Sequence, residues 1–121
     1  MLPQDHLKKA RRLKRTCLKL SPEKDWETIV ESCFGIALHL ITCLSGEKAG
    51  KHLDTHKGLS AFLVGIGLRE VSELFRELDS MRIGRWYGGK ENGKSARRAL
   101  AIVAELERMV GELNAGKGDE E

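Results

Sequence analysis

A short segment in the second half of the chain holds the side chains best suited to chemistry. It contains two arginines and two aromatic residues directly before a glycine pair: Arg82, Arg85, Trp86 and Tyr87. Guanidinium groups pair bidentately with phosphate, and an indole stacks on a base or anchors a protein interface. We therefore expect a groove for nucleic acid or a protein partner, lined by Leu78, Arg82, Arg85, Trp86 and Tyr87.

These residues close a segment with the apolar period of an α-helix, from about Leu68 to Tyr87. Positions i, i+3, i+4 and i+7 of a helix share one face. Arg82 and Arg85 continue the apolar stripe formed by Leu68, Val71, Leu74, Phe75 and Leu78. A guanidinium on such a stripe is costly unless it is paired or the stripe leaves the core. The pattern indicates a functional site or, alternatively, a structural arginine bonded to a buried carboxylate.

Two of the four histidines, His52 and His56, are four residues apart, a spacing that can place two metal ligands on one helix face. The zinc-protease pattern requires glutamate directly after the first histidine, and Leu53 occupies that position. Because no third ligand is evident, we expect no metal and no other cofactor. A small metal-dependent hydrolase that uses His52 and His56 stays an alternative.

The N-terminal segment is strongly basic. Residues 1–20 hold seven basic side chains against one acidic side chain, Asp5, which gives a local net charge of +6. The basic residues are Lys8, Lys9, Arg11, Arg12, Lys14, Arg15 and Lys19. Such a run is commonly a solvated helix face, and contact with phosphate is the more specific alternative.

The composition favours helices throughout. Only two prolines occur, and the segments between the glycine clusters are rich in strong helix formers. We expect an all-α fold, an up-and-down bundle of four to five helices, with a single domain over residues 1–113 and a flexible C-terminal tail over 114–121. Ser21 and Ser95 are expected to cap helices. The expected helices span residues 3–20, 21–44, 59–66, 68–87 and 95–113, with a polar connection over 45–58.

The second of these helices is apolar around most of its circumference and should lie at the centre of the bundle. Its longest apolar block, residues 33–44, is shorter than the roughly 20 residues that span a bilayer. The N-terminal segment is a charged helix that the apolar h-region of a signal peptide does not follow, so we expect no targeting signal, no membrane association and a cytoplasmic protein. Cys17, Cys33 and Cys43 are expected to be reduced, since Cys33 and Cys43 would lie about 15 Å apart on one helix.

The order of these signals resembles the HEPN superfamily. The resemblance rests on a histidine-containing segment, a short helix, a helix that closes on arginine and tyrosine, a glycine-rich turn, a serine cap and a final amphipathic helix. The residues that carry it are His56-Lys57-Gly58, Phe62-Leu63, Arg82, Tyr87, Gly88-Gly89 and Ser95. It implies a four- to five-helix bundle, usually a homodimer, whose arginine motif lines a groove at the dimer interface.

Many HEPN proteins are metal-independent ribonucleases with a motif of arginine, a short spacer and histidine. Others accompany a minimal nucleotidyltransferase in toxin–antitoxin pairs, or serve as RNA-binding or interaction modules. Arg82 matches the motif arginine, but Tyr87 stands where the histidine belongs, and Ile83 occupies a position that is usually polar. Tyrosine, with a pKa near 10, is poorly suited to moving a proton at neutral pH.

The resemblance therefore predicts a non-catalytic dimeric module that binds RNA or a protein, with a minimal nucleotidyltransferase as one candidate partner. The alternative is a ribonuclease with an altered site. In that alternative, Arg82 and Arg85 stabilise charge on the phosphate, and Tyr87 or His56 transfers the proton.

Overall fold

The computed structural model describes residues 2–49, 58–85 and 92–119, with side chains over 2–46, 58–82 and 93–113. Within these ranges the chain forms five α-helices and no strands, which confirms the all-α bundle. The helices are α1 (Pro3–Cys17), α2 (Trp26–Ala49), α3 (Leu59–Gly65), α4 (Arg69–Arg85) and α5 (Asn92–Asp119).

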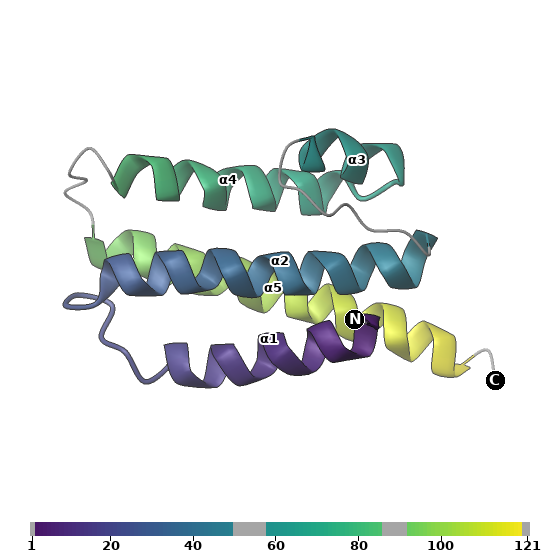
Figure 1. The fold of residues 1–121 in the computed structure, drawn as a ribbon, viewed down its shortest axis with the longest axis horizontal. Helices are drawn as coiled ribbons and strands as arrows, with labels where there is room; N and C mark the ends of the chain where they lie inside the picture. Colours follow the sequence, from purple (N-terminus) through teal and green to yellow (C-terminus); the bar gives the residue numbers. More distant parts are fainter. Residues whose placement is uncertain (1, 50–57, 86–91, 120–121) are drawn as a thin grey trace.

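The long helix α2 lies at the centre of the bundle. It packs against α1, α4 and α5, while the short α3 packs on α4 (Figure 1). Its buried side chains point in several directions around the helix, as its apolar circumference predicts. They are Ile29, Val30, Cys33, Phe34, Ile36, Ala37, Leu40, Ile41, Cys43 and Leu44.

By length and composition alone, the segment Trp26–Gly46 could cross a membrane. In the structure, 61% of an apolar 18-residue stretch of this segment is buried inside the bundle. Contact with the other helices therefore covers most of this apolar stretch.

The connection between the first two helices is longer than the sequence predicted. α1 ends at Cys17, and the amides of Lys19 and Leu20 donate to carbonyls three residues earlier, at 3.1 Å each. Ser21 caps a turn that precedes α2, because its hydroxyl accepts from the Lys24 amide at 3.3 Å. The carboxylate of Asp25 accepts from the Ser21 amide at 2.8 Å, and α2 then begins at Trp26 instead of Ser21.

The other helix ends also differ from the expected ones. α2 continues to Ala49. Ser45 fits inside the helix because its buried hydroxyl donates a hydrogen bond to the Thr42 carbonyl at 3.2 Å. α5 begins at Asn92, before the expected Ser95 cap. Asparagine and serine are both favoured at helix starts, so residue type alone does not predict which of the two begins the helix. The same helix runs on to Asp119 through the stretch expected to be a tail, where no proline interrupts it.

A glycine turn separates α3 from α4. Gly67 has a φ of 85°, in the left-handed region that glycine adopts readily. Its amide donates to the Val64 carbonyl at 3.0 Å, and the Leu68 amide donates to Leu63 at 2.8 Å. These bonds satisfy the carbonyls at the end of α3 and turn the chain into α4.

Candidate functional site

Arg82 lies near the end of α4 and contacts both its own helix and α2. Its Nε atom is 3.4 Å from the carboxylate oxygens of Glu31, and one Nη atom is 3.6 Å from Asp79 Oδ1. The guanidinium carbon lies 4.0 Å from the centre of the Phe34 ring, which is itself part of the core. The Arg82 side chain remains 31% exposed.

These contacts show how an arginine is accommodated on an apolar stripe. The guanidinium covers Phe34 at the rim of the core, and Phe34 in turn packs on Phe75 with ring centres 5.7 Å apart. Two carboxylates balance the charge of the arginine, so the structural alternative for Arg82 has direct geometric support.

The rest of the expected groove is only partly described. Leu78 is fully buried, so its side chain belongs to the core and is not available to line a surface groove. Arg85 ends α4, and its side chain lies outside the described part of the structure. Trp86 and Tyr87 fall outside the described residues as well.

The same limit applies to the candidate metal ligands. His52 and His56 lie outside the described residues. Among the residues that the structure describes, no group of three or more histidine, cysteine, aspartate or glutamate side chains could hold a metal ion.

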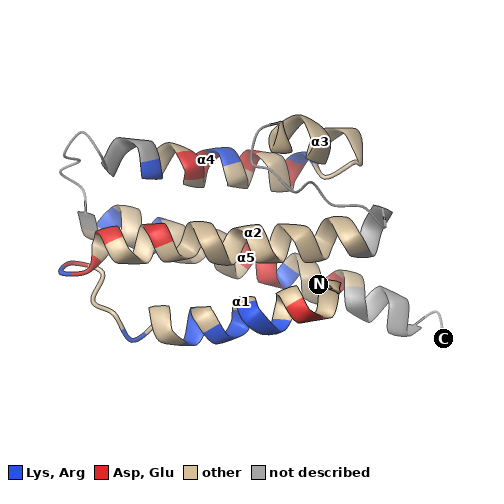
Figure 2. Cartoon of the chain, in the orientation of Figure 1, with Lys and Arg blue, Asp and Glu red and all other residues tan. Residues whose placement is uncertain are grey.

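The basic residues of α1 form its outer face. Five of the seven expected cations are exposed on or just after this helix, and none of the five forms an ion pair with another described residue. They are Lys8, Arg11, Arg12, Arg15 and Lys19, and we call this set the α1 basic face. Lys9 and Lys14 are partly buried, and Lys14 Nζ lies 3.1 Å from Glu107 Oε2 on α5. Figure 2 shows the run of basic residues along α1.

The three described arginines of α5 are paired. On α5, Arg97 pairs with Glu23, and Arg98 pairs with Glu77 of α4. The hydrogen bond from Arg98 lowers the pKa of the Glu77 carboxyl.

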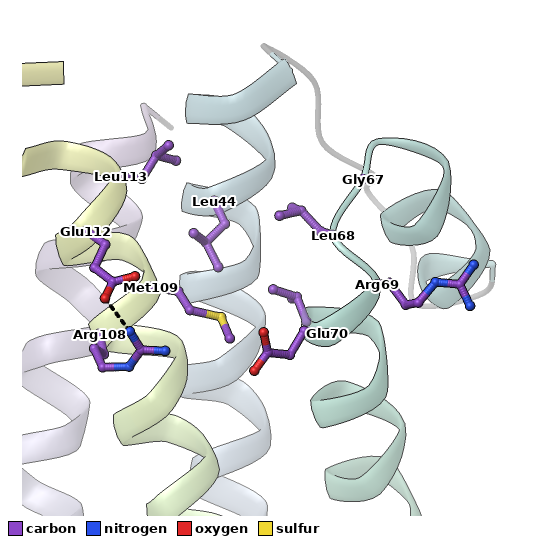
Figure 3. A pocket seen from close by; sticks show the side chains of 10 residues that line it. Leu44, Gly67, Leu68, Arg69, Glu70, Arg108, Met109, Glu112 and Leu113 are labelled. Carbon is purple, nitrogen blue, oxygen red and sulfur yellow. Dashed lines mark hydrogen bonds and ion pairs between the residues drawn. The ribbon is translucent and has the colours of Figure 1, made fainter. Parts of the chain in front are cut away.

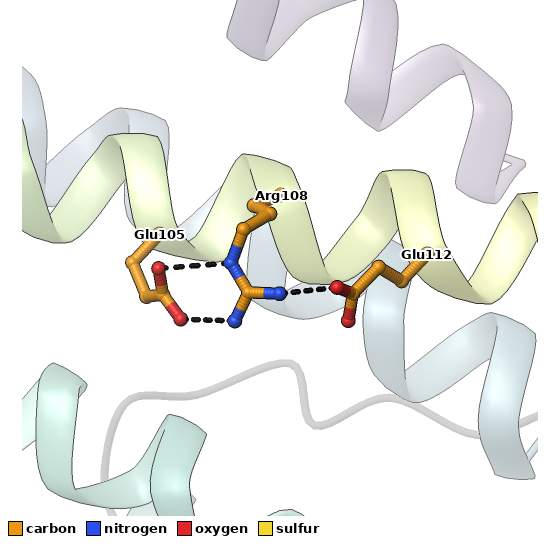
Figure 4. A network of polar contacts seen from close by, with 3 residues as sticks. All are labelled: Glu105, Arg108 and Glu112. Atoms are coloured by element: carbon orange, nitrogen blue, oxygen red, sulfur yellow. Dashed lines mark hydrogen bonds and ion pairs between the residues drawn. The ribbon is translucent and has the colours of Figure 1, made fainter.

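Further along α5, Arg108 lies between Glu105 and Glu112 and binds both (Figure 4). The cations of α5 are thus largely neutralised, whereas those of the α1 basic face are not.

A cavity of about 420 Å³ opens where the start of α4 faces the second half of α5. Leu44, Leu68 and Met109 point into this space, while Arg69 points away from it (Figure 3). The exposed lining of this cavity is mainly apolar. Because Arg108 is bound to carboxylates, the cavity also has little positive charge to attract an anion.

Two side-chain pairs that the sequence did not predict join α1 to α2. The Nδ1 atoms of His6 and His39 are 2.9 Å apart. Burial, together with the nearby His6 and Lys9, lowers the pKa of His39. The thiols of Cys17 and Cys33 are in hydrogen-bond contact, and burial raises the pKa of both. Only an expected pairing of helix faces could have suggested these contacts, because their partners are far apart in the sequence.

Comparison with protein-family models, with curated protein sequences and with solved structures finds no match. These comparisons assign the chain to no family. Three features of the molecule bear on its function: the five-helix bundle, the paired Arg82 and the α1 basic face.

Proposed function

We propose that this protein is a non-catalytic, HEPN-like helical bundle that forms a homodimer and binds RNA in the cytoplasm. The observation that carries the proposal is the α1 basic face, whose five exposed cations have no carboxylate partner among the described residues. Cations without partners are free to replace the counterions of a nucleic-acid backbone, and release of those counterions drives binding.

The contrast between α1 and α5 supports this assignment. A solvated surface needs charge of either sign, and α5 has interspersed charges that pair with one another. α1 instead concentrates charge of one sign on its exposed side. This asymmetry creates a positive potential that attracts a polyanion.

The contacts of Arg82 support a role without catalysis. A ribonuclease needs cationic groups directed at the charge that develops on the phosphate. The Arg82 guanidinium is held instead by Glu31, Asp79 and the Phe34 ring, which satisfy its charge within the bundle.

Titration with labelled single-stranded RNA, followed by fluorescence anisotropy at several salt concentrations, tests RNA binding. Neutralisation of phosphate charge by the five cations of the α1 basic face predicts that the logarithm of the association constant falls with the logarithm of salt with a slope of about −3.5. The RNA should stay intact on a denaturing gel. Absence of binding at about 50 mM salt would refute the RNA assignment and favour a protein partner, such as a minimal nucleotidyltransferase.

Cleavage of the RNA would test the second part of the proposal. Activity that is lost in Arg82→Ala would show that the protein is a ribonuclease with an altered site.

Light scattering coupled to gel filtration tests the dimer, for which we expect twice the mass of one chain. A monomer at micromolar concentration would remove the homodimer from the proposal.

A further inference from the structure

A cavity of about 290 Å³ lies between α1 and α5. Its α1 wall is built from residues at positions i, i+3, i+4 and i+7, which share one flank of a helix. The lining residues are Arg11, Lys14, Arg15, Leu18 and, from α5, Glu107. The cavity is therefore a defined hollow along one side of the α1 basic face.

The charges of this cavity do not cancel. Lys14 and Glu107 pair at 3.1 Å, and this pair joins the α1 wall to the α5 wall. Arg11 and Arg15 remain, both exposed and neither in an ion pair with a described residue. Side chains four residues apart on a helix have Cβ atoms about 5–6 Å apart, so both guanidinium groups can reach one phosphate.

The fifth lining residue is apolar. Leu18 directly follows the end of α1, and 58% of its surface is exposed, whereas Leu7 and Leu13 within the helix turn towards the bundle. An exposed leucine beside two arginines suits a ligand that combines an anionic group with an apolar, flat group. A nucleotide has both parts, whereas a simple anion has only the first.

We infer that the cavity between α1 and α5 binds one phosphodiester of single-stranded RNA. Arg11 and Arg15 donate hydrogen bonds to the phosphate oxygens, and the adjoining base packs on Leu18. Lys14 is a positioning residue, because its pair with Glu107 holds the two walls together. This inference rests on the proposed function and places RNA contact at the α1–α5 flank, away from Arg82.

The same helix supplies a matched control. Lys8 and Arg12 are also exposed, also four residues apart and also free of ion pairs with described residues. They belong to the α1 basic face but do not line the cavity. The double variants Arg11→Gln/Arg15→Gln and Lys8→Gln/Arg12→Gln therefore remove the same charge from one helix and differ in the site affected.

The experiment measures the affinity of both variants for a labelled single-stranded RNA at one fixed salt concentration. The cavity variant should lose about tenfold to a hundredfold in affinity, the range for lost hydrogen bonds to charged groups. The control should lose only a few-fold, as expected for general attraction. Circular dichroism should show unchanged thermal midpoints for both variants, because all four side chains are exposed.

A third variant tests contact with the base. Leu18→Ser should weaken binding of RNA about threefold or more, because the apolar contact with the base is lost. It should leave the affinity for inorganic polyphosphate, which has no bases, unchanged. An equal loss for both ligands would overturn the placement of the base on Leu18.

The remaining outcomes separate this inference from the proposed function. Equal losses in the two double variants would overturn the cavity site while RNA binding stands. Failure of the unmodified protein to bind RNA at low salt would overturn the proposed function itself. Binding to vesicles of anionic phospholipid in place of RNA would overturn both and identify a membrane surface as the partner of α1.

Discussion

The guanidinium of Arg82 stacks on the ring of Phe34, with 4.0 Å between the guanidinium carbon and the ring centre. This contact joins the end of α4 to the first half of α2. It also explains why the apolar stripe of α4 ends in an arginine. The stripe stays on the core, and the flat guanidinium covers the core at its edge.

We predict that Arg82→Ala lowers the free energy of unfolding by about 1–2 kcal/mol, since a partly exposed cation–π contact and ion pair are both lost. Arg82→Lys should cost less, because it keeps the charge but loses the planar stacking group. Urea denaturation measures both. Arg76→Ala, at an exposed position of the same helix, is the control and should change stability little. A stability loss no greater than that of the control would contradict the structural role of Arg82.

The His6–His39 contact predicts that stability depends on pH. Burial and the neighbouring His6 and Lys9 lower the pKa of His39 below its ordinary value of 6.5. The unfolded chain therefore binds this proton more readily than the folded protein does. The stabilisation is fully present above pH 6.5 and is lost as the pH falls towards the pKa of the folded state.

Urea denaturation at closely spaced pH values between 8 and 5.5 measures this effect. The window lies above the range in which Glu77 and Glu105 titrate, because their pKa values are lowered from 4.5. His39→Gln should flatten the pH profile within the window. An unchanged slope in this variant would show that another group is responsible.

Two glycines of α2 predict opposite responses to alanine. A Cβ atom at Gly35 would have no neighbour within 4 Å, so Gly35→Ala should stabilise the helix by about 0.5–1 kcal/mol. A Cβ atom at Gly46 would lie 2.9 Å from Cγ of Pro3, where α1 begins against α2. Gly46→Ala should therefore gain less or lose stability.

Thermal unfolding of the two glycine variants provides the comparison. Helix propensity contributes equally to both, so the difference between their midpoints reports the contact with Pro3. Equal gains would mean that the start of α1 does not pack closely on Gly46.

The cysteines predict low reactivity in the native state. Cys17, Cys33 and Cys43 are free and buried, and burial raises the pKa of Cys17 and Cys33, which lowers their thiolate fraction at neutral pH. A thiol-specific reagent should modify all three quickly in denaturant and slowly without it. Fast reaction of Cys17 or Cys33 in the native protein would indicate that α1 opens from α2 on the timescale of the assay.

Much of the fold was accessible from local sequence. The apolar period of α4 and α5 sets which side faces inward, and the apolar circumference of α2 predicts a central helix. The helix ends were less accessible. Ser45 begins a polar stretch that is typical of a connection, yet it lies inside α2. Its hydroxyl donates to the Thr42 carbonyl, and tertiary packing buries it.

Arg82 and Leu78 show what local sequence could and could not determine about the candidate site. The sequence identified Arg82 as unusual, yet it could not choose between a ligand groove and a structural pair. That choice depends on Glu31 and Phe34, which lie about fifty residues away and belong to another helix. Leu78 was expected to line a groove, but the packed bundle buries it completely.

The sequence by itself determined that the chain is helical, which faces are apolar and that α1 is basic, because these properties depend on the residues within a few turns of one another. Tertiary structure alone decided which faces meet. It paired Lys14 with Glu107 across 93 positions and His6 with His39 across 33 positions. Such pairs arise when helices pack, and no periodicity within one helix carries information about the neighbour that its surface will contact.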